Sequence, residues 1–339
     1  MKISKGLSFS SLFLSVFVLL FLLSSAYGQP IIKIDGSSTV FPITEGIAED
    51  FQKAKKGAVK VTVGISGTGG GFKKFCRGET DISNASRPIQ KKEMDACKEA
   101  GIKYIELPVA YDALSVFVNV KNNWIKDNCM TIEQLKKIWE PEAQGKITKW
   151  NQVDPSWPDR PLRLAGPGAD SGTFEYFTEA AVGKAKASRG DYVASEDDNV
   201  IMNAVIKDVG GLGYVGFTYV EENKGKVKAV AIKNPKTGKC VMPSEKAVMD
   251  GTYQPFSRPL FIYVNEKSAK EKPEVREFVE FYLKHAGKIT KQVGAIPLPA
   301  KAYQMALERF KKMETGTVFG GHIEVGLTVE ELLKRETKH

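Results

Sequence analysis

The chain of 339 residues is poor in the residue types on which several kinds of chemistry depend. It has three histidines (His285, His322 and His339) and four cysteines, none of them in a CxxC pair. A serine hydrolase needs a base beside its nucleophile, and a structural zinc site needs closely spaced Cys or His ligands. We therefore expect no catalytic residues and no metal site. The P-loop pattern GxxxxGK[ST] is also absent, and no other motif predicts a cofactor.

Arginine is scarce as well, because only nine of the 49 cationic residues are arginine and the lysines are scattered among carboxylates. A nucleic-acid-binding protein concentrates its basic residues, with arginine prominent, on one element. We therefore expect no nucleic-acid partner. The formal net charge of +9 is a diffuse surplus, and such a surplus attracts small anions.

The longest apolar run stands at the N-terminus. Lys2 and Lys5 precede about 17 apolar or small residues over 7–23, and Ala26-Tyr27-Gly28 follows them. This pattern is typical of a secretory signal peptide, which we assign to residues 1–28. A membrane anchor is the alternative, but the run is short for a bilayer span. No cysteine follows the run, so we expect no lipid anchor and a mature chain of 311 residues in the periplasm.

The four cysteines of an exported chain imply two disulfide bonds. Three pairings are possible. Cys76 and Cys97 are 21 residues apart, whereas Cys129 and Cys240 are distant in the sequence. We predict the pairs Cys76–Cys97 and Cys129–Cys240.

Strand-like and helix-like patterns alternate along the rest of the chain. Residues 31–35 and 59–65 are predicted strands, and a helical pattern follows each of them. Residues 107–120 predict one longer strand, and residues 259–265 predict another. This alternation favours an α/β fold with a largely parallel sheet. No low-complexity tether is present, so we expect two domains to be joined by crossing strands.

A strand, a loop of Gly, Ser and Thr, and a helix occur in this order three times. The loops are GSSTV at 36–40, SGTGGG at 66–71 and DSGT at 170–173. The first N–H groups of a helix lack partners within the helix and carry the positive end of its dipole, so they bind anions. Each loop alone is weak evidence, because Ser or Thr at such a position mostly caps its own helix. Three of them in one chain indicate a shared oxyanion site.

Two further segments carry charges that could belong to a site. Arg87 stands before Pro88, which favours an extended backbone at the arginine, and a guanidinium suits bidentate binding of a tetrahedral oxyanion. A surface arginine is the alternative. The acidic run at 195–199 could suggest a cation site, but it precedes a helical pattern, and we interpret it as helix capping.

Seven motifs together resemble a known family, the periplasmic phosphate-binding proteins of the phosphate ABC importer (the PstS family, and especially its SphX branch). The motifs are GSSTVFP, SGTGGGFKKF, DISNASRPI, ELPVAYDALSVFVN, IWEP…GKITKWNQV, GPGADSGTFEYF and RPLFIYV. The resemblance implies a type II periplasmic-binding-protein fold, with two α/β lobes, a two-strand hinge and the ligand in the cleft. It implies a first lobe over 29–115 and 258–339 and a second over 116–257. The hinge is then expected around Ser115–Asn119 and Phe261–Asn265.

The resemblance also implies which residues bind phosphate: Ser38, Thr39, Val40, Thr68, Arg87, Asp112, Ser171, Gly172 and Thr173, with Ser66 and Asp170 as further candidates. The family pattern has an arginine where this chain has Pro167 and an aspartate where it has Arg87. The binding cation is therefore expected to have moved to the first lobe. Asp112 and Asp170 are the candidates for the carboxylate that accepts the proton of hydrogen phosphate, although either could instead cap a helix or pair locally.

The function implied by the resemblance is capture of inorganic phosphate and its delivery to an ABC-type permease in the membrane. We expect a monomer that is not an enzyme. A receptor for sulfate, molybdate or tungstate is an alternative on the same fold. A secreted phosphatase built on the same loops is a further alternative, which the scarcity of histidine disfavours.

Overall fold

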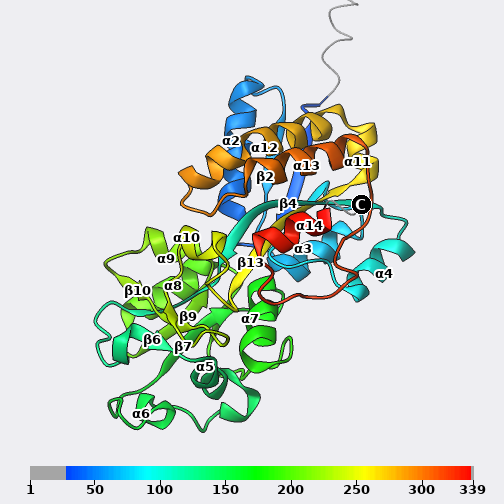
Figure 1. The fold of residues 1–339 in the computed structure, drawn as a ribbon. Helices are drawn as coiled ribbons and strands as arrows, with labels where there is room; N and C mark the ends of the chain where they lie inside the picture. Colours follow the sequence, from blue (N-terminus) through cyan, green and yellow to red (C-terminus); the bar gives the residue numbers. More distant parts are fainter. Residues whose placement is uncertain (1–27, 337–339) are drawn as a thin grey trace, which may run out of the picture.

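The computed structural model describes residues 28–336, so residues 1–27 of the assigned signal peptide lie outside the described residues. Two five-stranded sheets, each covered by helices, form the two halves of the molecule (Figure 1). We call the first sheet with its helices lobe 1 and the second sheet with its helices lobe 2. The α/β fold with two lobes that the sequence predicted is confirmed.

The sheet of lobe 1 is mixed. Its strands, in spatial order, are β2 (Lys60–Val63), β1 (Ile31–Gly36), β3 (Ile82–Ala85), β13 (Ser257–Asn265) and β4 (Tyr104–Ala113). Strand β1 is parallel to β2 and β3, whereas β13 is antiparallel to β3 and β4. The expectation of a largely parallel sheet is wrong at β13, because this strand returns from the other lobe. The helices of lobe 1 are α2 (Phe41–Ala54), α3 (Gly67–Phe75), α4 (Lys91–Glu99), α11 (Glu266–Glu271), α12 (Pro273–Gln292), α13 (Ala300–Lys311) and α14 (Val329–Glu336).

Lobe 2 has a second mixed sheet and a small third one. The main sheet runs β10 (Val227–Ala229), β5 (Ser115–Asn119), β9 (Gly211–Val215), β7 (Arg163–Pro167) and β8 (Val193–Ser195). The small sheet runs β12 (Cys240–Val241), β11 (Ala231–Lys233) and β6 (Cys129–Met130). The helices of lobe 2 are α5 (Ile132–Trp139), α6 (Trp150–Val153), α7 (Gly172–Val182), α8 (Asp198–Lys207), α9 (Phe217–Glu222) and α10 (Glu245–Met249), with short 3₁₀ turns at Lys126–Asn128 and Pro141–Ala143.

The chain passes between the lobes at two adjacent points. The strand predicted over 107–120 is divided at Leu114, where β4 of lobe 1 gives way to β5 of lobe 2. The return passage lies just before β13, and the Leu114 N–H donates to Phe256 O at 2.9 Å. The hinge predicted around Phe261–Asn265 is therefore wrong, because those residues pair with β3 and β4 inside lobe 1.

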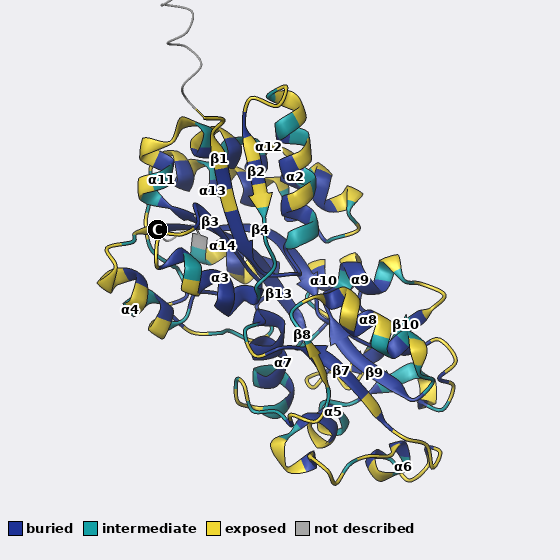
Figure 2. Cartoon of the chain, turned by 180° about the vertical axis from the view of Figure 1, so that it is seen from behind, coloured by how far each residue is buried: buried dark blue, intermediate teal, exposed yellow. Residues whose placement is uncertain are grey.

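The central strands of both main sheets are largely buried, whereas the edge strands β2 and β8 are partly exposed, as is much of the surface of the helices and loops (Figure 2). Both predicted disulfide bonds are present, Cys76–Cys97 between α3 and α4 and Cys129–Cys240 between β6 and β12. Each bond therefore joins elements of one lobe and leaves the contact between the lobes free of covalent links. Across residues 28–336, no helix has both the length and the apolar composition that a bilayer span needs.

Candidate functional site

The three Gly/Ser/Thr loops meet where the two lobes face each other. The first connects β1 to α2 and the second connects β2 to α3, both in lobe 1, while the third connects β7 to α7 in lobe 2. The Gly69 N–H of the second loop donates to Asp170 O of the third at 2.7 Å. The N-termini of α2, α3 and α7 thus converge on one region, with N–H groups that have no partner within their helices. Convergence of these helix dipoles makes the region attractive to an anion.

Glycine is required where the first two loops turn. Gly36 has φ +137°, and a Cβ there would overlap Asn84 O on the neighbouring strand. Gly67 has φ +73° and begins α3. Side chains are strained at such φ values, so the loops need glycine to bring their backbones this close. Val40, which is buried, is the N-cap residue of α2.

Each of the three loops places a threonine hydroxyl in hydrogen-bond contact with another hydroxyl. Thr39 Oγ1 lies 3.1 Å from Thr173 Oγ1, which joins the first loop to the third. Thr68 Oγ1 lies 3.1 Å from Ser86 Oγ and accepts a hydrogen bond from the Ser86 N–H. A Cβ at Gly172 would lie only 2.5 Å from Thr68 Oγ1. The third loop is therefore in close contact with both loops of lobe 1.

A buried arginine and aspartate lie beside these hydroxyls. Arg258 is the second residue of β13 and is paired with Asp112 in the register of β13 with β4. Its Nε and Nη2 donate to Asp112 Oδ2 at 3.0 and 2.8 Å, and Nη2 also donates to Thr173 Oγ1 at 2.8 Å. Its Nη1 donates to Ser86 O at 3.0 Å. The Arg258 side chain is fully buried, so its positive charge acts in a medium of low dielectric constant.

A second buried aspartate approaches the site from α8. Asp198 is 1% exposed, and its Oδ2 accepts a hydrogen bond from Ser38 Oγ at 3.1 Å. Burial raises the pKa of this carboxyl to about 7; the Ser38 hydroxyl opposes the increase, and the negative charge of Asp112 adds to it. Asp198 Oδ1 is buried and has no hydrogen-bond partner among the described residues. A buried carboxylate oxygen normally accepts a hydrogen bond, and none of the described protein atoms supplies one to this oxygen.

The remaining predicted residues of the third and second loops differ in their surroundings. Ser171 Oγ caps α7 by accepting from the Thr173 and Phe174 N–H groups at 3.1 and 3.4 Å. Asp170 is partly exposed and pairs with Lys73 at 2.8 Å. Ser66 Oγ donates to Asp35 Oδ1 at 2.5 Å. The side chains of Asp170 and Ser66 are thus paired with Lys73 and Asp35. Among the described residues, neither side chain bonds to Arg258 or to its partners Asp112 and Thr173.

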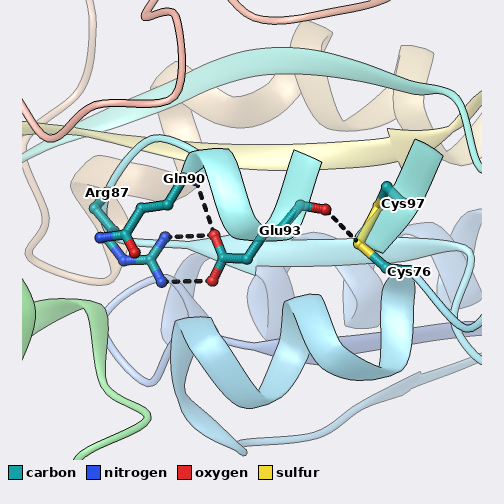
Figure 3. The surroundings of a disulfide bond; sticks show 5 residues. All are labelled: Cys76, Arg87, Gln90, Glu93 and Cys97. Atoms are coloured by element: carbon teal, nitrogen blue, oxygen red, sulfur yellow. Dashed lines mark hydrogen bonds and ion pairs between the residues drawn. A yellow bond between two sulfur atoms is a disulfide. The ribbon is translucent and has the colours of Figure 1, made fainter. Parts of the chain in front are cut away.

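Arg87 lies at the contact between the lobes, but two carboxylates hold its guanidinium. Its Nη1 and Nη2 donate to the two oxygens of Glu93 at 2.9 and 2.7 Å, as Figure 3 shows. Its Nε lies 2.8 Å from Glu175 Oε2 on α7. Burial opposes the charge on Arg87, but the two carboxylates outweigh it and raise the pKa of the guanidinium. Both Nη atoms of the guanidinium are hydrogen-bonded within the protein and its Nε faces the Glu175 carboxylate, which would repel an anion on that side; this argues against the predicted role of Arg87 in the anion site.

Three residues of this site were missed by sequence reasoning: Arg258, Asp198 and Ser86. Ser86 stands next to Arg87 in a motif that drew attention only for its arginine. Asp198 was interpreted as part of a helix cap, and Asp197 does cap α8 by accepting from the Asn199 N–H at 2.9 Å. Arg258 had one signal in the sequence, because it directly precedes a long apolar run. A charged residue at the start of a buried strand is costly to bury without a partner, so its position indicated that a partner was present.

Chemically, the site offers hydroxyls, helix N–H groups, one arginine and two carboxylates. Such a set can bind a tetrahedral oxyanion through charge-assisted hydrogen bonds. His285 and His322 lie on α12 and after α13, outside the three loops. Within the described residues, no cluster of three or more His, Cys, Asp or Glu is placed to hold a metal ion.

Comparisons with known proteins give a consistent result. The model of the PBP superfamily domain matches residues 24–285. The chain is 56% identical over 308 residues to protein SphX of Synechococcus elongatus, which covers 91% of this chain and 89% of that one. It is 41% identical to the phosphate-binding protein PstS of Staphylococcus saprophyticus, over 82% of this chain and 84% of that one. A solved structure of a possible phosphate binding protein from Planctomyces limnophilus is 43% identical, with a TM-score of 0.62, and covers 85% of this chain and 100% of that one.

Proposed function

The chain belongs to the PBP superfamily and, within it, to the family of the SphX and PstS proteins, and we propose that it captures inorganic phosphate for an ABC-type permease. The meeting of the three loops at the contact between the lobes, with the buried Arg258 bonded to Thr173 of the third loop, is the observation that carries this proposal. We infer that the protein acts in the periplasm as a monomer, without a lipid anchor and without catalysis.

Phosphate can leave water for a closed cleft only if the protein replaces the hydrogen bonds of its hydration shell. We assign this task to the hydroxyls of Ser38, Thr39, Thr68 and Thr173, to the N–H groups at the starts of α2, α3 and α7, and to Arg258. Bonds to an ionised group are shorter and stronger than neutral ones, so a few such donors hold the anion tightly. Ser171 and Gly172 contribute through the start of α7, where the dipole is most positive.

Selectivity needs a group that distinguishes hydrogen phosphate from sulfate, since the two anions share a shape and differ by a proton. A carboxylate acceptor pairs with that proton and repels an anion that lacks it. Asp112 has both oxygens engaged, by the Phe217 N–H and by Arg258. Asp198 Oδ1 has no hydrogen-bond partner among the described residues. We therefore favour Asp198 as the acceptor, in place of the earlier candidates Asp112 and Asp170.

Capture requires the site to open and close. The resemblance implied lobes over 29–115 with 258–339 and over 116–257; we propose that the lobes move about the crossings at Leu114 and Phe256, which places Ser115 of β5 in lobe 2 and Ser257 of β13 in lobe 1. The loops of both lobes contribute donors, so phosphate stabilises the closed form over the open one. The closed form is then the one that docks on the permease.

Isothermal titration calorimetry of the mature chain tests this function directly. We expect the wild type to bind phosphate tightly. The double variant Arg258→Gln/Asp112→Asn, which removes both charges together, should weaken phosphate binding at least about a hundredfold. Arg163→Gln is the matched control. It also removes an arginine with an aspartate partner, but Arg163 is exposed and its Nε lies 3.8 Å from Asp208 Oδ2 in a loose surface pair. Wild-type affinity in the double variant would refute the assignment of the site. Tighter binding of sulfate or molybdate, or hydrolysis of a phosphomonoester, would refute the proposed function itself.

A further inference from the structure

The last part of the chain returns to the contact between the lobes. After α13, residues 315–336, which we call the C-terminal strap, lie along lobe 1. The strap is anchored to β4, where Gly316 N–H donates to Tyr104 O at 2.9 Å and Val318 N–H donates to Glu106 Oε1 at 3.0 Å. Several of its apolar side chains are buried: Phe319, Leu327, Val329 and Leu332. The strap is therefore a packed part of lobe 1.

The strap makes a hydrogen bond to α7 of lobe 2 at Tyr176. Gly326 N–H donates to the Tyr176 hydroxyl at 2.7 Å. The same hydroxyl lies 2.9 Å from Ser257 O and 3.1 Å from Pro255 O, on the return passage between the lobes. Gly326 has φ +73°, and a Cβ there would overlap the Gln254 side chain. The close approach of the strap to Tyr176 thus depends on a glycine.

Tyr176 also contacts the anion site. Its ring lies 5.4 Å from the Arg258 guanidinium carbon, within the range of a cation–π interaction. The next residue, Phe177, stacks on Tyr214 of the lobe 2 sheet with ring centroids 3.8 Å apart. Tyr176 is therefore held from lobe 2 by its backbone and from lobe 1 by its hydroxyl, with its ring against the cation of the site.

We propose that Tyr176 is a positioning residue for anion binding, held by the C-terminal strap and in turn holding Arg258 against the third loop. The inference rests on the proposed function, since it concerns the same site. Arg258 makes its bond to Thr173 only when α7 lies against lobe 1, and the Tyr176 hydroxyl bonds to lobe 1 in that same arrangement. The strap thus favours the closed form, in which the donors already face the anion and bind it with less loss of entropy.

The test compares Tyr176→Phe with Tyr303→Phe. Tyr303 is the matched control, because its buried hydroxyl also accepts from a backbone N–H, that of Leu298, and donates to a backbone carbonyl, that of Val109, but entirely within lobe 1. We expect phosphate to dissociate about tenfold faster from Tyr176→Phe in stopped-flow experiments, whereas Tyr303→Phe should keep the wild-type rate. Equal rates for both variants and the wild type would overturn the proposal. Failure of the wild type to bind phosphate would instead refute the proposed function.

A double-mutant cycle separates positioning from general stability. In the background Arg258→Lys, which keeps a charge but loses the planar guanidinium, the effect of Tyr176→Phe on phosphate affinity should shrink to less than about twofold. An unchanged effect would show that Tyr176 does not act through Arg258.

Hydrogen exchange on the wild type gives a third measurement that needs no variant. Coupling is reciprocal, so phosphate must stabilise the strap if the strap stabilises the closed form. Saturating phosphate should slow exchange of the Gly326 amide, while the amides of α12 serve as the internal reference. Unchanged exchange at Gly326, with slower exchange in the third loop, would contradict a role for the strap.

Discussion

Replacement of Asp198 by asparagine gives the sharpest test of how the site selects its anion. The two side chains have the same shape, but asparagine has no charge and its amide can donate. Asp198 is buried and bonded to Ser38, and its pKa is raised to about 7, so it changes its charge near neutral pH. If it accepts the proton of hydrogen phosphate, the variant loses one charge-assisted bond. Phosphate affinity should then fall about tenfold to a hundredfold.

Sulfate supplies the contrasting result. Below about pH 7 the Asp198 carboxyl of the closed form is protonated and can donate to an anion without a proton, whereas above it the carboxylate repels such an anion. The apparent affinity of the wild type for sulfate should therefore fall about tenfold from about pH 6 to about pH 8, the ratio of the protonated fractions. In Asp198→Asn the affinity for sulfate should not depend on pH in this range.

The same shift affects closure without a ligand. Closure raises the pKa of Asp198 from an ordinary value of 3.8 toward about 7, so the closed form binds more protons than an open form in which the carboxyl faces water. The contribution of Asp198 to the free energy of closure is therefore most favourable below about pH 4, where it is on the order of 4 kcal/mol at most. It is lost as the pH rises through about 7. An ionised Asp198 therefore opposes closure of the empty protein at neutral pH.

Calorimetry with phosphate and with sulfate at about pH 6, 7 and 8 measures the changes in phosphate affinity and in sulfate affinity. Asp197→Asn is the matched control, because it removes the same charge from the adjacent residue and keeps an oxygen that can cap α8. The control should keep the preference for phosphate, with a slightly lower midpoint for the change in sulfate affinity. The reasoning is refuted if Asp198→Asn keeps the wild-type ratio of phosphate to sulfate affinity at every pH.

Two further changes test the contact between the lobes. Glu175→Gln removes one of the two carboxylates that hold Arg87. We expect phosphate binding to weaken about tenfold and the melting temperature to fall. Unchanged phosphate affinity in calorimetry would show that the pair Arg87–Glu175 does not favour closure. Gly172→Ala introduces a methyl group 2.5 Å from Thr68 Oγ1. We expect phosphate binding to weaken about a hundredfold, while the melting temperature of the phosphate-free protein stays within a few degrees of the wild type. Tight binding by this variant would mean that α7 closes less fully on lobe 1 than described.

The parts of the fold and site that could be predicted are those with a local sequence signature. Each of the three loops combines the end of a strand, a glycine that permits close approach and the start of a helix, and all of these lie within about eight residues. The long apolar run over 107–120 was also recognised, but its division at Leu114 was not. Both halves are buried in sheets, so the sequence is equally apolar on either side of the passage between lobes.

The contacts that could not be predicted join residues far apart in the chain. Arg258 and Asp112 are 146 residues apart and become partners only through the antiparallel register of β13 with β4. Asp198 has the local pattern of a helix start, but in the fold it is buried and hydrogen-bonded to Ser38 of the other lobe, 160 residues away. Burial that arises from the contact between two lobes leaves no periodicity in either of them.

The choice between Arg87 and Arg258 shows what such long-range contacts decide. Both arginines are fully buried at the contact between the lobes, and each has acidic partners. Glu93 and Glu175 occupy the guanidinium of Arg87, whereas Arg258 divides its donors between Asp112, Ser86 O of lobe 1 and Thr173 Oγ1 of lobe 2. Arg258 is the second residue of β13, the strand that returns from lobe 2, so the residue proposed to bind the anion lies next to the passage about which the lobes are proposed to move. A cation placed there links both lobes to the anion in one side chain, and closure and binding then become a single event.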